Sequence, residues 1–343
     1  MNFCVLVPIL FFTCTNKIER SISYKINEIT FPIPINAIVG SWNFHFFEDD
    51  IIFFDHDTQQ ILRYSFETQK LISQHKLSTL APFEEVYFNY FFKLSNDLLA
   101  FYSLTREKLY ITDLNLNVIK TLDLLGSGFE ISFPRNQNLI YSDDFIYFVG
   151  KDHAKPDNQI TLLKVDIGSE APKILHVADI SLPLSYFDWG PFFSLPYLVD
   201  NGHDLFVTFP ASDRIVTFPG FKFGEQQILS DPTISFEAFN SVDPVALEGD
   251  FERLNSLPVF IHSIFDPNHK RLFRFMKILK PNDSIPAINV HIYEEKSSKK
   301  QIKLGHEHYH LAANIHNGKV YFVDFWNYTK NENIIVLKEI TLN

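Results

Sequence analysis

The sequence predicts an all-β protein, and three observations support this prediction. Phe, Ile, Leu and Tyr are abundant and Gly is scarce, and aromatic and β-branched residues favour strands. Short apolar segments, many of them alternating with polar residues, recur along almost the whole chain. Between them lie sequences with strong turn chemistry, including Asp55-His56-Asp57, Asp266-Pro267-Asn268 and Asn317-Gly318.

The predicted strands fall into groups of four that begin about 45–60 residues apart, the period of four-stranded propeller blades. The groups span residues 42–75, 86–122, 136–180, 194–229, 259–304 and 309–340. The last group has three strands, and an unassigned strand lies at 22–31. Pairing the two closes the ring and removes exposed sheet edges. We therefore predict a six-bladed β-propeller as a single domain over residues 22–343. A β-sandwich array is the structural alternative.

The hairpin with the clearest sequence pattern spans residues 259–276. It consists of an apolar strand, an Asp-Pro-Asn turn and a strand that combines aromatics with arginines. We interpret it as the innermost two strands of the fifth blade. Arg271 and Arg274 are three positions apart, so in a strand they face opposite sides. An inward-facing arginine would need a carboxylate partner. We expect Arg274 to hold the blade together and to have no chemical role.

The N-terminus is expected to carry a lipoprotein signal peptide over residues 1–13, followed by a tether over 14–21. Residues 3–12 are almost wholly apolar, and Thr13 and Cys14 follow them. This pattern resembles a bacterial lipoprotein signal, whose Cys is acylated after cleavage. The apolar run is too short for a permanent transmembrane helix. A plain signal peptide and a buried first strand are the alternatives.

Composition restricts the classes of partner. The formal charge of −11 argues against a nucleic-acid-binding surface, which needs clustered Lys and Arg. Cys4 would leave with the signal and Cys14 would carry lipid, so the mature chain would have no thiol for a disulfide, a zinc site or a nucleophile. We expect a monomer that contacts the membrane only through its lipid anchor.

The strand 260–265, the turn Asp266-Pro267 and the segment 271–275 (R-L-F-R-F) resemble the signature of a Bacteroidetes lipoprotein family of unknown function. That family is named domain of unknown function 4221, and it is similar to six-bladed propellers. Phe273 stands where its signature has Tyr. The resemblance covers nearly the whole chain after the signal. It implies a location in the bacterial cell envelope, in the periplasm or at the outer-membrane surface, and implies no catalytic residues.

Ligand contacts are expected in the loops that lead into the innermost strands, because long ordered loops on a rigid scaffold often carry function. These loops lie at about 78–85, 126–135, 181–193, 230–256 and 303–308. The loop 181–193 is unusually aromatic, and Tyr186, Trp189 and Phe192 suit a protein, peptide or glycan partner. A hydrophobic plug over the blades is the alternative. Arg253 could contact a polar ligand, and a solvated acidic loop is its alternative.

The segment richest in side chains that could bind a metal or a ligand is His306-Glu307-His308-Tyr309-His310. In an extended strand, His306, His308 and His310 lie on one side and could bind a divalent transition metal. They would span about 13 Å, too far for one ion without bending. His306 and His308 are therefore weak candidates for a metal, and His308 and His310 are candidates for ligand contact. An ordinary polar rim is the alternative, and we expect no cofactor.

Two functions remain from the sequence. The first is a non-catalytic binding or scaffold protein for a protein, peptide or glycan. The alternative is a metal-assisted propeller hydrolase or lactonase with its site at the channel mouth. The chain has no Gly-rich phosphate loop and no G-x-S-x-G nucleophile elbow, so we favour binding over catalysis.

The lipid anchor gives a direct prediction. Substitution Cys14→Ala removes the thiol that would be acylated, so labelled palmitate should no longer enter the protein and the protein should leave the membrane fraction. Cys4→Ala is the matched control and should keep the label. Palmitate that still enters the Cys14→Ala protein would show that the assignment of the anchor is wrong.

Overall fold

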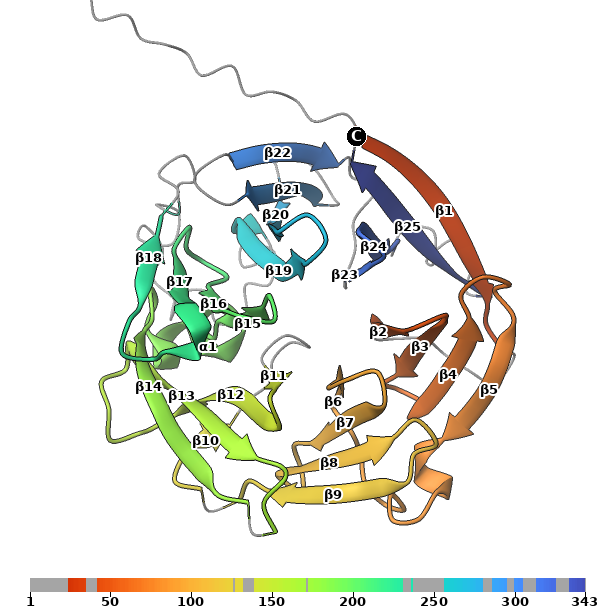
Figure 1. Ribbon diagram of the computed structural model, residues 1–343, viewed down its shortest axis with the longest axis horizontal. Coiled ribbons are helices and arrows are strands. Elements are labelled where there is room, and N and C mark those ends of the chain that lie inside the picture. Colours follow the sequence, from red (N-terminus) through yellow and green to blue (C-terminus); the bar gives the residue numbers. More distant parts are fainter. Residues whose placement is uncertain are drawn as a thin grey trace, which may run out of the picture.

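The structure, a computed structural model, is a ring of six β-sheets around a central axis (Figure 1). It describes residues 24–34, 42–125, 127–131, 139–170, 172–230, 236, 256–279, 286–294, 299–304, 313–324 and 333–342. Five sheets have four strands and one has five. The predicted six-bladed propeller of four-stranded blades is therefore confirmed, with one additional short strand in blade 3.

Blades 1 to 3 follow the sequence from the axis outward, strand by strand. Blade 1 consists of β2 (Trp42–Phe47), β3 (Asp50–Asp55), β4 (Gln60–Ser65) and β5 (Leu71–Lys76). Blade 2 consists of β6 (Tyr90–Lys93), β7 (Leu98–Ser103), β8 (Lys108–Asp113) and β9 (Val118–Asp123). Blade 3 consists of β11 (Leu139–Ser142), β12 (Phe145–Lys151), β13 (Gln159–Asp166) and β14 (Ile174–Ser181), and the extra strand β10 (Glu130–Ile131) pairs with β12.

Blades 4 and 5 repeat the same outward order. Blade 4 consists of β15 (Tyr197–Asp200), β16 (Leu205–Thr208), β17 (Ile215–Phe218) and β18 (Gln227–Leu229). Blade 5 consists of β19 (Val259–Asp266), β20 (Arg271–Ile278), β21 (Ala287–Glu294) and β22 (Lys299–Leu304). Two short 3-10 helices lie at Leu77–Thr79 and Pro219–Phe221.

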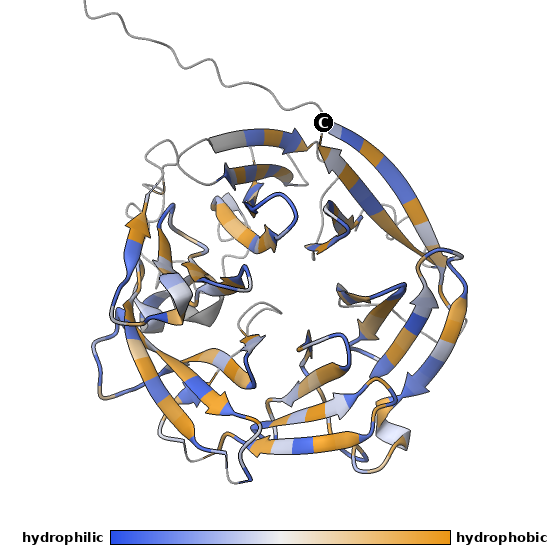
Figure 2. Ribbon diagram, in the orientation of Figure 1, coloured by the Kyte–Doolittle hydropathy of each residue, from blue (hydrophilic) through white to orange (hydrophobic). Residues whose placement is uncertain are grey.

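Blade 6 joins the two ends of the chain. It consists of β23 (Ala313–His316), β24 (Lys319–Val323), β25 (Ile334–Leu342) and, outermost, β1 (Tyr24–Pro32). β1 runs antiparallel to β25 from Tyr24 opposite Leu342 to Pro32 opposite Ile334. Hydrophobic and hydrophilic residues alternate along β1 (Figure 2), as expected for a strand with one covered face. The predicted closure by an N-terminal strand is thus confirmed.

The predicted turns form where the sequence places them. The carboxylate of Asp55 accepts hydrogen bonds from the backbone N–H groups of Asp57 and Thr58 at 3.1 and 3.3 Å. Asp266 accepts one from Asn268 at 3.0 Å. Such bonds stabilise tight turns locally. In the β23–β24 turn, Asn317 and Gly318 have φ of 49° and 73°, the left-handed region that an Asn-Gly hairpin requires.

Apolar side chains fill every interface between blades. A typical cluster joins blades 6 and 1, where Phe31 of β1 packs edge-on against Phe53 and Tyr64 with ring centroids 5.5 and 5.3 Å apart. Seven further clusters of buried residues lie at the other five interfaces, three of them between blades 4 and 5. Each sheet therefore has apolar residues on both of its faces, and Phe is frequent among the buried residues that the structure describes.

Polar side chains also cross each of the six interfaces and donate to a backbone carbonyl of the neighbouring blade. Such bonds give carbonyl groups at the interfaces a hydrogen-bond partner. They are Asn43 to Phe91, Lys120 to Ile167, Arg214 to Ser181, Tyr197 to Phe260, Tyr24 to Lys303 and Asn314 to Phe44.

Arg274 reinforces the interface between blades 4 and 5. It is fully buried, and its guanidinium donates to the carbonyl oxygens of Phe209, Ser212 and Asp213 at 2.8, 2.7 and 3.0 Å. It also lies 3.6 Å from the ring centroid of Phe260. Arg271 faces the other side and pairs with Glu294 at 3.0 Å. Backbone carbonyls thus take the role that we expected of a carboxylate, because the β16–β17 turn presents three of them together.

The segment 181–193, predicted as a loop, contains helix α1 (Tyr186–Ser194), and the strand expected at 194–199 begins at Tyr197. The Ser185 hydroxyl caps the helix by accepting a hydrogen bond from the backbone N–H of Asp188 at 3.3 Å. Phe193 then packs into a buried cluster with Leu257. Within the described ranges, no helix is long and apolar enough to cross a membrane.

The contribution of ring closure to stability can be tested by removing a large side chain from the apolar cluster between blades 6 and 1. Phe31 of β1 is 0% exposed, so Phe31→Ala should lower the free energy of unfolding by about 3–5 kcal/mol. Tyr24→Ala in the same strand is the control, because Tyr24 is 37% exposed and should contribute far less. Denaturant titration followed by fluorescence measures both. Equal, small losses for the two variants would mean that β1 is not needed for a stable ring.

Candidate functional site

The innermost strands of all six blades surround a cavity of about 400 Å³ on the propeller axis. In Figure 1 these strands, β2, β6, β11, β15, β19 and β23, face one another around the centre of the ring. The cavity also reaches the turns that follow β19 and β23, at Pro267-Asn268 and Asn317-Gly318. It therefore extends to the ends of the innermost strands, away from the loops that lead into them.

His45 of β2 forms one wall of the cavity together with Asn314 of β23. The amide of Asn314 donates to Nδ1 of His45 at 3.1 Å and to the carbonyl of Phe44 at 3.1 Å, while its oxygen accepts the backbone N–H of Ile315. These bonds fix the amide orientation, so the proton of the neutral imidazole lies on Nε2. Nε2 itself is covered, and the backbone carbonyl of Phe91 lies near the imidazole.

Burial lowers the pKa of His45 to about 3, and the positive charge of Lys93 acts in the same direction. The backbone carbonyl of Phe91 opposes this shift. The ring of Phe91 lies edge-on to the imidazole with centroids 5.2 Å apart. His45 is therefore neutral at physiological pH, and a charged form would be costly in this position.

Lys93 of β6 supplies the cation of the cavity wall. Its ammonium donates to the carbonyl of Phe46 at 2.6 Å and lies 4.8 Å from the ring centroid of Phe47. Burial lowers the pKa of Lys93, and the carboxylate of Glu48 opposes this. Half-burial without an ion pair to any described carboxylate leaves its charge incompletely compensated.

His316 stands next to Lys93 at the end of β23. Its ring stacks on Phe46 with centroids 4.5 Å apart and an interplanar angle of 15°. Burial lowers the pKa of His316, the charge of Lys93 lowers it further, and Asp49 opposes the change. Blades 6, 1 and 2 thus line one sector of the cavity with three basic side chains, of which Lys93 holds the charge.

The sector formed by blades 3, 4 and 5 carries an acid and hydroxyl groups. Asp200 at the end of β15 accepts the backbone N–H of Gly202 at 3.0 Å, and burial raises the pKa of Asp200. The hydroxyl of Tyr141, on β11, donates to Asp144 at 2.8 Å. Ser263 of β19 shares a hydrogen bond of 2.7 Å with Thr208. Acceptors and donors on blades 3 to 5 therefore share the cavity with Lys93 of blade 2.

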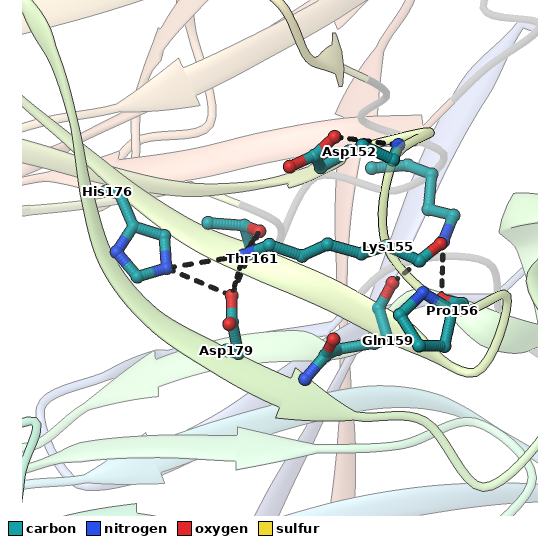
Figure 3. Close-up of polar contacts among 9 residues, drawn as sticks. Asp152, Lys155, Pro156, Gln159, Thr161, His176 and Asp179 are labelled. Carbon is teal, nitrogen blue, oxygen red and sulfur yellow. Dashed lines mark hydrogen bonds and ion pairs between the residues drawn. The ribbon is translucent and has the colours of Figure 1, made fainter.

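A second polar cluster lies on the outer strands of blade 3, away from the cavity. Lys155, Thr161 and His176 converge on Asp179, with His176 Nε2 and Thr161 Oγ1 at 2.9 and 3.2 Å from its carboxylate (Figure 3). Burial raises the pKa of Asp179, but the hydrogen bonds from Lys155 and His176 lower it overall. The cluster joins β13, β14 and the preceding turn, so we assign it a structural role.

The predicted ligand-contact residues divide into two sets. Tyr186 lies in α1, where it is buried and donates to Glu130 at 2.9 Å, and half-buried Trp189 packs against Phe193 with centroids 6.1 Å apart. Neither lines the cavity. The other candidates fall outside the described residues or have side chains outside them, and they are Phe192, Arg253, His306, His308, His310 and the lipidation site Cys14. Their predicted roles stay predictions.

The cavity residues were not singled out from the sequence. His45, Lys93, Tyr141, Asp200 and His316 each stand in, or end, a short apolar strand, and each is half-buried. The sequence signal that could have identified them is a polar side chain in each predicted innermost strand. The described residues contain no group of three His, Cys, Asp or Glu placed to hold a metal ion.

No protein-family model and no curated protein matches the sequence. Among solved structures, a member of the duf4221 family from Bacteroides vulgatus superposes with a TM-score of 0.72 at 12% identity, covering 95% of this chain and 99% of that one. The fold of that family is the fold of this chain. The likeness predicted from residues 260–275 is therefore confirmed at the level of structure.

Two further structures share the architecture at lower similarity. A putative exported protein from Bacteroides fragilis has a TM-score of 0.59 at 9% identity, covering 93% of this chain and 95% of that one. A catalytically inactive virginiamycin B lyase from Staphylococcus aureus with quinupristin has a TM-score of 0.50 at 11% identity, covering 94% and 100%. At these identities the comparisons show the fold alone.

The lowered pKa of His45 predicts a specific loss of stability in acid. The unfolded state binds a proton near pH 6.5 and the folded state only near pH 3, so the free energy of unfolding should fall as pH drops between these values. One such group contributes a slope of at most about 1.4 kcal/mol per pH unit. The lowered pKa of His316 changes the free energy of unfolding with pH in the same direction.

The substitution His45→Asn should make this slope shallower between pH 6.5 and 5, as measured by denaturant titration at each pH. Asn keeps an acceptor for Asn314 and cannot become charged. His203→Asn is the control, because the side chain of His203 is 82% exposed. An unchanged slope in the His45→Asn protein would exclude His45 as the source of acid sensitivity.

Proposed function

We propose that the protein is a lipid-anchored propeller of the bacterial cell envelope that binds a glycan, peptide or protein partner at its axial cavity without converting it chemically. The observation that supports this proposal is the cavity of about 400 Å³ lined by all six innermost strands. Ligand sites typically measure about 300–1,000 Å³ and combine apolar walls with a few oriented polar groups. The partly exposed Phe265 supplies apolar surface here.

The polar groups of this cavity are fixed in place. Asn314 is held by three hydrogen bonds and positions His45, and Lys93 is held by the carbonyl of Phe46. Groups that are oriented before a ligand arrives lose little freedom on binding, which favours recognition. A location outside the cytoplasm is supported by the apolar run that ends at Cys14 and by the fold shared with an exported protein from Bacteroides fragilis.

The binding role is tested by obstructing the cavity at its rim. Asn268 is exposed in the turn after β19 and lines the cavity, so Asn268→Trp should block partner binding without disturbing the core. His203→Trp places the same ring in the equivalent turn of blade 4, outside the cavity lining, and should bind normally. Panels of oligosaccharides and peptides are titrated against the full chain in detergent.

We expect saturable binding of at least one class of compound, unchanged after recovery, and at least tenfold weaker binding to the Asn268→Trp protein. Binding that is indifferent to Asn268→Trp would place the site elsewhere. Conversion of the bound compound would contradict the non-catalytic role.

A further inference from the structure

The axial cavity is polarised. Among its described lining residues, Lys93 is the sole Lys or Arg and Asp200 is the sole Asp or Glu. Lys93 belongs to blade 2 and Asp200 to blade 4, so the two charges stand on different walls, separated by blade 3. A chain of formal charge −11 therefore presents a half-buried cation to an open cavity that small molecules can enter.

The Lys93 ammonium has capacity for a ligand. It has three N–H donors, and its hydrogen bond to the carbonyl of Phe46 uses one of them. The basic neighbours His45 and His316 make no ion pair with a described carboxylate. No such carboxylate therefore takes the place of an entering anion. An entering anion would find one positive charge that is half-buried, and a charge-assisted hydrogen bond to it is stronger than one between neutral groups.

Asp200 gives the wall formed by blade 4 its selectivity. Its Oδ1 accepts the N–H of Gly202, and no hydrogen bond of the described residues uses Oδ2. A carboxylate oxygen of this kind accepts hydroxyl donors and repels anions. Asn268 and Asn317 at the rim add amide donors and acceptors. A ligand with a negative group at one end and hydroxyls at the other would fit this polarity in one orientation.

We propose that the cavity binds a hydroxylated carboxylate of the sugar-acid class, with its carboxylate at Lys93 and its hydroxyls at Asp200, an assignment that rests on the binding role proposed above. Charge complementarity on two walls of one cavity recognises both parts of such a molecule. A neutral sugar would leave Lys93 without an anion, and a simple acid would leave Asp200 without a donor.

Titration calorimetry of the full chain in detergent, with D-glucuronate and D-glucose at low salt, tests the assignment. Glucuronate should bind at least about tenfold more tightly than glucose, because only glucuronate forms the charge-assisted bond. Lys93→Gln removes the charge and should abolish this preference. Lys120→Gln is the matched control, because Lys120 also donates to carbonyls of a neighbouring blade, at Ile167 and Ser169, but lies on the outer strand β9.

Equal affinity for the two sugars in the unmodified protein, or a preference that survives Lys93→Gln, would overturn the assignment. If the Lys93→Gln protein does not fold, Asp200→Asn decides, since loss of the negative charge should raise the ratio of glucuronate to glucose affinity and an unchanged ratio would refute the polarity. A neutral oligosaccharide or peptide that binds tightly and is blocked by Asn268→Trp would preserve the binding role and refute the ligand class.

Discussion

The pairing of β1 with β25 is the interaction on which the ring depends. It brings the two ends of the chain into one sheet, and buried polar contacts secure it. Lys338 of β25 is paired with Glu28 of β1 and, at 3.2 Å, with fully buried Asp324. Asn27 of β1 donates to Glu339 at 2.9 Å. An unpaired β25 would expose a sheet edge and open the apolar cluster around Phe31. The contact of Asn314 with His45 crosses the same junction, so closure also sets the cavity wall.

Between the other blades, apolar packing and polar bonds have different consequences. Apolar clusters supply most of the burial, but they tolerate small shifts of one sheet against another. A side chain that donates to a buried carbonyl has far less freedom, because a displaced blade leaves the carbonyl unsatisfied. Arg274 shows the strongest form of this restraint, with three carbonyls of blade 4 around one guanidinium. We infer that these bonds fix the separation of the innermost strands and hence the width of the cavity.

Most of the fold could be predicted from the sequence because it depends on local signals. Alternation with period two and the Asp and Asn-Gly turns determine the blades, and one unassigned N-terminal strand together with a C-terminal group of three strands determines the closure. Helix α1 could not be predicted, because it depends on a single serine cap and on packing of Phe193 against Leu257, far along the chain. The cavity residues could not be predicted for a related reason. Alternation tells which face of a sheet a residue occupies, but Lys93 and Asp200 become neighbours of one cavity only when six strand edges converge.

The position of β1 also determines how the ring could be carried on a membrane. Its first residue, Tyr24, lies on the outermost strand of blade 6, at the circumference of the disc (Figure 1). A lipid on Cys14 would be joined to Tyr24 by about ten residues, which span at most about 35 Å when extended. A molecule attached at its circumference, and not at its axis, can change its tilt relative to the membrane. Both ends of the axis then stay open to the aqueous side, and large partners could approach without displacing the attachment.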